Sequence, residues 1–271
     1  MNMLRYASLL SALMLVATLA GCVNQLSRDA NRLNGYQAYR NEDYDTARER
    51  FVSVLDADPT DWRSHYYVGL IALNEDDDPV TARRHLDISY TIYQGRATKR
   101  LNYEIGDPKT GVPYPTRSDI LDATAEAIYQ QGNEQLLHAF LRQAVEEEGD
   151  VTDHLRMGRY MQKIGDPDSA RSSYRAAIRS VGGSDPEPYI RYADFYESIG
   201  DQSRAATQLR KAYGIDPEHR GLGSRLRAHG YVPGPTVAIP HDQPEDTPPQ
   251  PAQPEDDASD EADSEDDPSE E

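Results

Sequence analysis

The chain has one cysteine, Cys22, among its 271 residues. A single thiol excludes an intramolecular disulfide and leaves a zinc site without a cysteine pair. Hydrophobic residues make up only 37% and the mean hydropathy is -0.79, so little apolar material is available for one large core. Phe and Trp are scarce, at 3 and 1, whereas 18 tyrosines carry a hydroxyl that needs water or a hydrogen-bond partner. This composition fits a thin layered structure with half-buried helix faces.

The chain also lacks any excess of positive charge. Its formal net charge is -19, and residues 242–271 hold 14 Asp and Glu with no Lys or Arg, so -19 minus -14 leaves -5 for residues 1–241. The acidity therefore belongs mainly to the C-terminal segment. Because binding to a phosphate backbone needs a Lys/Arg surface, we expect no nucleic-acid partner.

Catalytic and metal-binding motifs are missing as well. The seven histidines are scattered, without an H-E-x-x-H motif, and the acidic runs at 75–78 and 146–148 lack the alternating oxygens of a calcium loop. The Gly-Leu-Gly at 221–223 follows no predicted strand, so it does not read as a phosphate loop. We therefore predict a protein that is not an enzyme and has no cofactor, no metal and no small-molecule substrate.

The first 22 residues have the layout of an export signal, with Arg5, an apolar run and small residues before Cys22. The run is shorter than the about 20 apolar residues of a comfortable transmembrane helix. Its end, Leu-Ala-Gly-Cys at 19–22, resembles the lipobox of bacterial lipoproteins. The resemblance implies a signal peptide over residues 1–21, acylation of the Cys22 thiol and a lipidated linker over residues 22–27. The alternative is a plain secretory signal or a signal anchor.

The same resemblance implies a location. An acylated Cys22 makes the protein an exported lipoprotein that is anchored to a membrane. Val23, rather than Asp, follows the cysteine. The resemblance therefore further implies the periplasmic face of the outer membrane, if the source has two membranes.

Residues 186–219 show most clearly what the rest of the chain is built from. Apolar residues recur there at helical spacing, over 189–199 and again over 205–213, on either side of a turn at Gly200 and Asp201. The segment therefore reads as two antiparallel helices. Such a hairpin cannot bury its apolar faces alone, which predicts stacked copies of it.

Those copies are visible in the sequence. A small residue of the first helix, a small residue of the second helix and a closing proline follow one another 12 positions apart, as Ala193, Ala205 and Pro217 and again as Gly35, Ala47 and Pro59. Further copies occupy 62–95, 151–184 and, in degraded form, 118–150. With a period of about 34 residues, this pattern resembles the tetratricopeptide repeat. The resemblance implies an all-α, right-handed superhelical solenoid of about five helical hairpins.

The mature chain divides into five parts on this basis: repeats 1–2 over 28–96, a non-repeat insert over 97–117, repeats 3–5 over 118–219, a capping helix over 220–231, and a disordered Pro-rich and acidic tail over 232–271. The insert has no helical period, so it is a partner contact, a structural plug or a mobile loop. The tail is a solubilising brush, or it binds a basic partner or the chain's own Arg-rich groove.

A stacked array offers a curved surface lined by its first helices. Helical spacing places on it nine residues that we predict to bind a partner: Arg32, Tyr36, Tyr39, Arg40, Tyr66, Asn74, Tyr129, Arg159 and Lys163. Tyr and Arg often dominate interfaces, because they combine a large buried area with directional polar groups. Tetratricopeptide domains that clamp a terminal carboxylate carry asparagines where this chain has Tyr36 and Leu70, so that activity is not implied.

The sequence thus predicts a lipid-anchored envelope scaffold that binds an envelope protein or an extended peptide through its concave face, in the assembly of an envelope complex. Two alternatives remain open. One is a structural or cation-buffering surface lipoprotein, and the other is an accessory subunit of an envelope enzyme.

Overall fold

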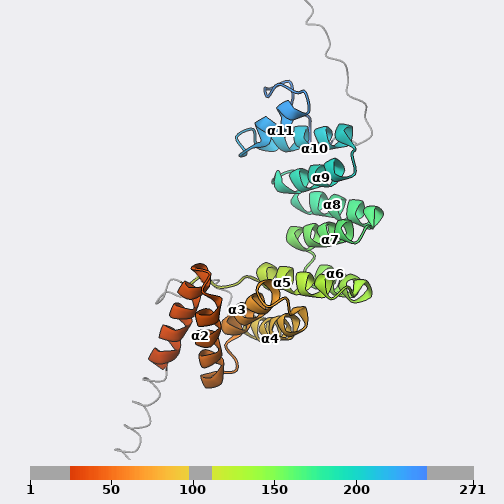
Figure 1. Cartoon of the computed structure of the whole chain (residues 1–271). Coiled ribbons are helices and arrows are strands. Elements are labelled where there is room, and N and C mark those ends of the chain that lie inside the picture. Colours follow the sequence, from red (N-terminus) through yellow and green to blue (C-terminus); the bar gives the residue numbers. More distant parts are fainter. Residues whose placement is uncertain (1–24, 98–111, 243–271) are drawn as a thin grey trace, which may run out of the picture.

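A computed structural model describes residues 25–97 and 112–242 of the chain. Within these residues, five helical hairpins follow one another along a bent array, and a short helix closes the last (Figure 1). Hairpin 1 pairs the helix over residues 25–40 with α2 (Tyr44–Ala57), hairpin 2 pairs α3 (Trp62–Asn74) with α4 (Pro79–Ala97), and hairpin 3 pairs α5 (Arg117–Gln130) with α6 (Glu134–Glu147). Hairpin 4 pairs α7 (Val151–Lys163) with α8 (Pro167–Val181), hairpin 5 pairs α9 (Glu187–Ser198) with α10 (Gln202–Ile215), and α11 (Leu222–Ala228) follows. The prediction of an all-α solenoid of helical hairpins is confirmed.

Most of these helices begin where a polar side chain satisfies a backbone N–H group of the first turn. The side chain accepts a hydrogen bond from the N–H three residues further on at Asp43, Asp61, Thr116, Asn133, Asp150, Asp166 and Asp201. Gly200, just before one of these caps, has a φ of 80°, a left-handed conformation that glycine adopts without a Cβ clash. The predicted turn at Gly200 and Asp201 is therefore present.

Small residues allow neighbouring helices to approach closely. A Cβ atom on Gly69 would lie 2.8 Å from Cγ of Leu86, and one on Gly158 would lie 2.9 Å from the ring of Tyr174. In the second helices, the matching positions are fully buried and hold Ala47, Ala82, Ala170 and Ala205, with Leu137 in hairpin 3. The recurring small residues of the sequence are thus explained by helix packing.

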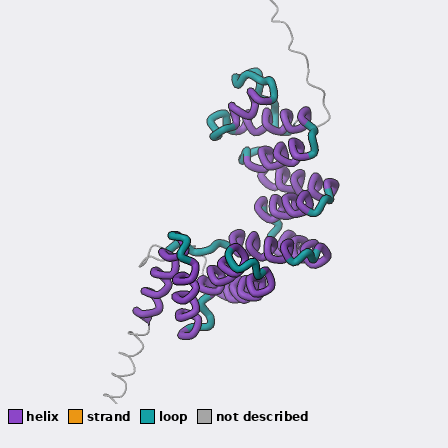
Figure 2. Tube along the Cα trace, viewed as in Figure 1, coloured by secondary structure: helices purple, strands orange, loops and turns teal. Residues whose placement is uncertain are grey.

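The array has an inner and an outer side. Successive first helices contact one another directly, α3 with α5, α5 with α7 and α7 with α9. Among the described residues, no comparable backbone approach joins successive second helices, although the Tyr90 hydroxyl of α4 donates to Glu147 of α6 at 2.7 Å. Because helices on the inside of a curve are closer together, the first helices line the inner side, and the second helices lie outside. Figure 2 shows the hairpins stacked in chain order along this bend.

One end of the predicted insert packs against hairpin 2. Val112 is buried, and the ring of Tyr114 lies 6.3 Å from the ring of Trp62. The guanidinium carbon of Arg63 lies 4.9 Å from the same Tyr114 ring. These contacts give residues 112–116 a packing role, whereas residues 98–111 of the insert lie outside the described residues.

The predicted tail begins later than the sequence indicates. Residues 231–242, which we call the C-terminal strap, pack back onto the last hairpin. Val237 is 7% exposed and joins the core that α9, α10 and α11 share, and its carbonyl oxygen accepts a hydrogen bond from Nε of Arg210 at 2.8 Å. The boundary predicted at residue 232 is therefore too early, because apolar residues of the strap cover the end of the array. Residues 243–271 lie outside the described part of the chain.

The N-terminal predictions also fall outside the described residues. These are the signal peptide over 1–21, the lipidated Cys22 and the start of the linker. Within residues 25–97 and 112–242, no helix is both long and apolar enough to span a bilayer.

Candidate partner-binding surface

Three half-buried tyrosines line the inner side of hairpins 1 and 2. They are Tyr36 and Tyr39 of the helix over residues 25–40 and Tyr66 of α3, and we call them the tyrosine face. Each ring contacts the ring of buried Tyr67, at centroid distances of 5.7, 5.3 and 5.3 Å. Tyr67 stacks in turn on Phe51 at 4.9 Å. The core therefore holds the three rings in place from beneath, and each keeps some surface exposed.

The hydroxyl groups of Tyr39 and Tyr66 are protonated at neutral pH. Burial raises the pKa of Tyr39, and the neighbouring Tyr44 adds to the rise, whereas a hydrogen bond from Asn74 opposes it. Burial also raises the pKa of Tyr66, and Asp119 adds to that rise. Both side chains can thus donate a hydrogen bond to a carbonyl group of a bound peptide.

An open pocket of about 330 Å³ adjoins the tyrosine face, where hairpins 1 and 2 turn. It is lined by Glu42, Asp43, Tyr44, Asp45, Arg48, Glu75 and Asp76. The ring of Tyr44 lies 5.6 Å from that of Tyr39, which connects the pocket to the face. Arg48 pairs with Asp76 across the two turns. Five carboxylates against one guanidinium make this edge negatively charged.

On hairpins 3 and 4, carboxylates of α5 pair with cations of α7. Asp122 lies 2.7 Å from Arg159, and Glu126 lies 2.7 Å from Lys163. All four side chains are partly exposed, at 29% to 49%. The cations on this part of the inner surface are therefore already neutralised by the neighbouring hairpin.

Lys163 also interacts with two aromatic rings. Its Nζ lies 4.8 Å from the ring centre of Tyr129 and 4.9 Å from that of Tyr160, which is the geometry of cation–π contacts. Burial raises the pKa of Glu126, but hydrogen bonds from Lys163 and Tyr160 outweigh burial, so this pKa lies below its ordinary value. Glu126 is therefore ionised at neutral pH.

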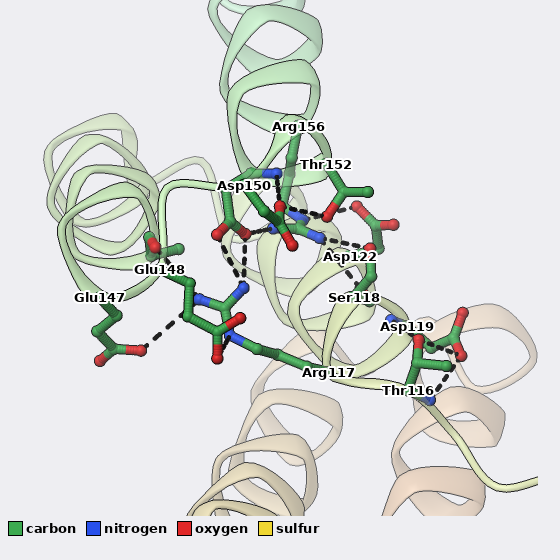
Figure 3. Close-up of polar contacts among 12 residues, drawn as sticks. Thr116, Arg117, Ser118, Asp119, Asp122, Glu147, Glu148, Asp150, Thr152 and Arg156 are labelled. Carbon is green, nitrogen blue, oxygen red and sulfur yellow. Dashed lines mark hydrogen bonds and ion pairs between the residues drawn. The ribbon is translucent and has the colours of Figure 1, made fainter. Parts of the chain in front are cut away.

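A buried ionic network lies beside these pairs and joins α5 to α7 (Figure 3). Arg156 donates to Asp153 at 2.6 Å, to Asp122 at 2.8 Å and to the Ser118 hydroxyl at 2.8 Å. Arg117 donates to both carboxylate oxygens of Asp153, at 2.9 and 2.8 Å. Because a buried charge needs all of its partners, this network fixes hairpin 4 on hairpin 3.

Two histidines pair within hairpin 2. Nδ1 of His65 lies 2.9 Å from Nδ1 of His85, and Nε2 of His65 lies 3.1 Å from the carbonyl oxygen of Pro59. Since a carbonyl can only accept, Nε2 of His65 carries the proton, and His85 donates to the bare Nδ1 of His65. Burial lowers the pKa of His85 to about 4. In the described part of the chain, no group of three or more His, Cys, Asp or Glu could hold a metal ion.

A family model for the tetratricopeptide repeat matches residues 33–97 and 155–220. The chain contains tetratricopeptide repeats. The two matches fall on hairpins 1 and 2 and on hairpins 4 and 5, and hairpin 3, the degraded copy, lies between them. Stacked repeats of this kind form scaffolds with an extended concave surface for binding other proteins.

Solved structures of several proteins align with the chain. PilW, described as a widely conserved type IV pilus biogenesis factor, aligns with a TM-score of 0.51 and 14% identity over 73% of this chain and 82% of its own. MamA aligns with a TM-score of 0.47 and 16% identity, over 71% and 93%. YrrB, described as a TPR protein with an unusual peptide-binding site, aligns with a TM-score of 0.43 and 16% identity, over 78% and 96%. The likeness to PilW shows the fold alone, and the comparison with curated protein sequences finds no match.

Most of the predicted partner-binding residues gather in two places on the repeat array. Tyr36, Tyr39 and Tyr66 form the tyrosine face, with Asn74 at its edge and Arg40 exposed on the same first helix. Tyr129, Arg159 and Lys163 meet on hairpins 3 and 4, where both cations are paired. The two groups share the inner side of the repeats, but they differ in what they can offer to a partner.

Arg32 does not belong to either group. Its side chain is 7% exposed and lies 2.9 Å from Asp61 and 3.2 Å from Asp29. The prediction that Arg32 contacts a partner is wrong for a physical reason. Asp61 caps α3 of the next repeat and lies over Arg32, which helical spacing within one repeat cannot reveal.

The partner-binding residues predicted from the sequence did not include the carboxylates of the inner surface. Asp122 and Glu126 each precede their cationic partner by 37 positions, close to one repeat length. This equal offset between acidic and basic residues of successive first helices is the signal that could have found them.

Proposed function

We propose that this protein is a lipid-anchored scaffold of the cell envelope, which binds a protein or an extended peptide in the assembly of an envelope complex. The tyrosine face carries the proposal. Its rings are supported by Tyr67 and Phe51, so little side-chain freedom remains to be lost when a partner binds. Their hydroxyl groups can bond to a partner's backbone, which suits an extended segment.

The charges of the inner surface, and of the pocket beside the tyrosine face, favour a partner with basic side chains. Arg159 and Lys163 are neutralised by Asp122 and Glu126, so they do not recruit an acidic ligand. The pocket beside Tyr44 is lined mainly by carboxylates. A Lys or Arg of the partner can lie against a tyrosine ring and reach these carboxylates.

Capture of partners from an envelope fraction tests the binding surface. The full chain is compared with Tyr39→Ala/Arg40→Ala, which removes one ring of the face and the exposed guanidinium beside it. A control, Arg171→Ala, alters a partly exposed arginine on the outer side of the repeats. We expect the double variant to lose partners that the control keeps. Both should still unfold cooperatively on heating, the double variant at a lower temperature because the Tyr39 ring packs on Tyr67. Equal recovery from the double variant and the control would remove the tyrosine face as the binding site.

The anchor is tested separately. The Leu-Ala-Gly-Cys at 19–22 supports acylation of Cys22 after export. In cells grown with labelled palmitate, we expect the wild-type chain to become labelled. We also expect it to fractionate with the membrane, and with the outer membrane where the source has two membranes. A Cys22→Ser chain that still fractionates with the membrane would contradict the proposed anchor. That result would not bear on the tyrosine face as the binding site.

A further inference from the structure

An arginine stripe runs along α8 on the outer side of hairpin 4. Arg171, Arg175 and Arg179 are spaced at i, i+4 and i+8, which places them on one face of the helix. Arg175 and Arg179 are exposed, and Arg171 is partly exposed and lies 3.1 Å from Asp168 of the same helix. At about 1.5 Å per residue, the stripe is about 12 Å long.

The C-terminal strap leads the chain to this stripe. It crosses α10, where the N–H of Ile239 donates to the carbonyl oxygen of Arg210 at 3.5 Å. The ring of His241 then rests on Gly183, which follows the C-terminal end of α8. Gly183 is four residues beyond Arg179. The described chain thus ends beside the C-terminal end of the arginine stripe.

The residues that follow have the complementary charge. Residues 243–271 hold 13 Asp and Glu and no Lys or Arg. The first two, Glu245 and Asp246, are three and four residues beyond the end of the strap, a reach of about 10–14 Å at about 3.5 Å per residue. This reach matches the length of the stripe. The strap also holds the acidic segment at a high effective concentration near the arginines.

We propose that the acidic segment 243–271 docks on the arginine stripe of its own molecule. The carboxylates of Glu245 and Asp246 bind the guanidinium groups nearest the end of the strap, Arg179 and Arg175, and the later acidic residues extend the contact toward Arg171. The occupied surface belongs to a second helix, so the segment lies on the outer side of the array. It therefore leaves the tyrosine face free for a partner.

Photo-crosslinking in the full-length chain tests this docking. A benzophenone amino acid replaces Ser172, an exposed residue beside the stripe, and the crosslinked peptides are identified by mass spectrometry. We expect crosslinks to residues 243–271 within one molecule in 50 mM salt. In 1 M salt, where the Debye length falls to about 3 Å, their yield should fall roughly tenfold.

Charge variants give the matched comparison. Arg171→Gln/Arg175→Gln/Arg179→Gln should reduce the crosslink yield as strongly as 1 M salt does. The control Arg84→Gln/Arg142→Gln/Arg227→Gln makes the same change in net charge at exposed positions elsewhere and should leave the yield unchanged. Thermal unfolding verifies that both triple variants fold. The salt series uses the chain that carries only the benzophenone substitution, so its result does not depend on either triple variant.

Three results would overturn the proposal. They are the absence of crosslinks to residues 243–271, yields that neither salt nor the stripe variant lowers, and crosslinks found only in covalent dimers. The last would assign the stripe to the acidic segment of a second copy. If crosslinks are absent and the stripe variant alone loses binding to phosphatidylglycerol vesicles, the stripe belongs to a membrane surface instead.

Discussion

The guanidinium group of Arg156 lies 2.6 Å from the carboxylate of Asp153, and the two side chains are 1% and 0% exposed. Both residues belong to α7, yet each is also bound by hairpin 3, Arg156 by Asp122 and Asp153 by Arg117. The pair therefore does more than stabilise one helix. It requires hairpin 3 and hairpin 4 to be in register before either charge is satisfied.

Removing the shared acceptor should be costly for folding. Asp153→Ala leaves the guanidinium groups of Arg156 and Arg117 without their common partner, so we expect a loss of about 3–5 kcal/mol in the free energy of unfolding. Urea unfolding followed by circular dichroism measures it. The control Asp168→Ala breaks the exposed pair with Arg171 and should cost less than about 1 kcal/mol. Equal losses from the two variants would contradict the buried network.

A glycine at the contact of two helices should resist enlargement. Gly158→Ala places a Cβ 2.9 Å from the ring of buried Tyr174, so the ring or the helix must move, at about 1–3 kcal/mol. Gly95→Ala is the matched control in α4, because no atom lies within 4 Å of the added Cβ. That substitution should instead stabilise the helix by about 0.5–1 kcal/mol. Opposite shifts of the urea midpoint are thus expected, and shifts of the same sign would contradict this packing.

Much of the fold could be predicted because each repeat is specified by residues that lie close together in the sequence. The 12-residue spacing of Gly35, Ala47 and Pro59 follows from the close packing of helices within one hairpin and against its neighbour. Asp201 marks the start of a helix because its side chain accepts a hydrogen bond from a backbone N–H of the first turn. Such signals depend on residues a few turns apart. They need no knowledge of how distant hairpins face one another.

The surface was less predictable, because it depends on residues of other repeats. Helical spacing places both Arg32 and Arg159 on the inner side. Asp61 of the next repeat covers Arg32 and buries it, whereas Asp122 pairs with Arg159 and leaves it partly exposed. The amino-acid composition also did not predict that the C-terminal strap packs on the last hairpin. A segment rich in Pro and polar residues is typical of a tail, yet Val237 and Tyr231 pack against the apolar end of the array.

The histidine pair predicts a loss of stability in mild acid. The folded state keeps His85 neutral down to about pH 4, whereas an unfolded histidine takes up a proton near pH 6.5. Between these values the unfolded state binds more protons, so the free energy of unfolding should fall as the pH is lowered from 7 to 5. The urea midpoint measured at both values tests this expectation.

His85→Asn supplies the comparison, since asparagine does not titrate. Its urea midpoint should fall less between pH 7 and pH 5 than that of the wild type. His154, whose pKa burial also lowers, contributes in the same direction in both chains, so the difference isolates His85. An equal fall in the two chains would show that the histidine pair is not the source.

The strap should contribute to the stability of the last hairpin. Val237→Asp places a carboxylate in the core formed by α9, α10 and α11, where the side chains of the cluster are apolar. We expect a loss of about 3 kcal/mol or more and earlier thermal unfolding. Val232→Asp introduces the same charge five residues earlier in the strap, where the side chain is 81% exposed, and should change stability by less than about 0.5 kcal/mol. If both variants unfold like the wild type, the strap does not cover the array in solution, and the predicted boundary at residue 232 would be restored.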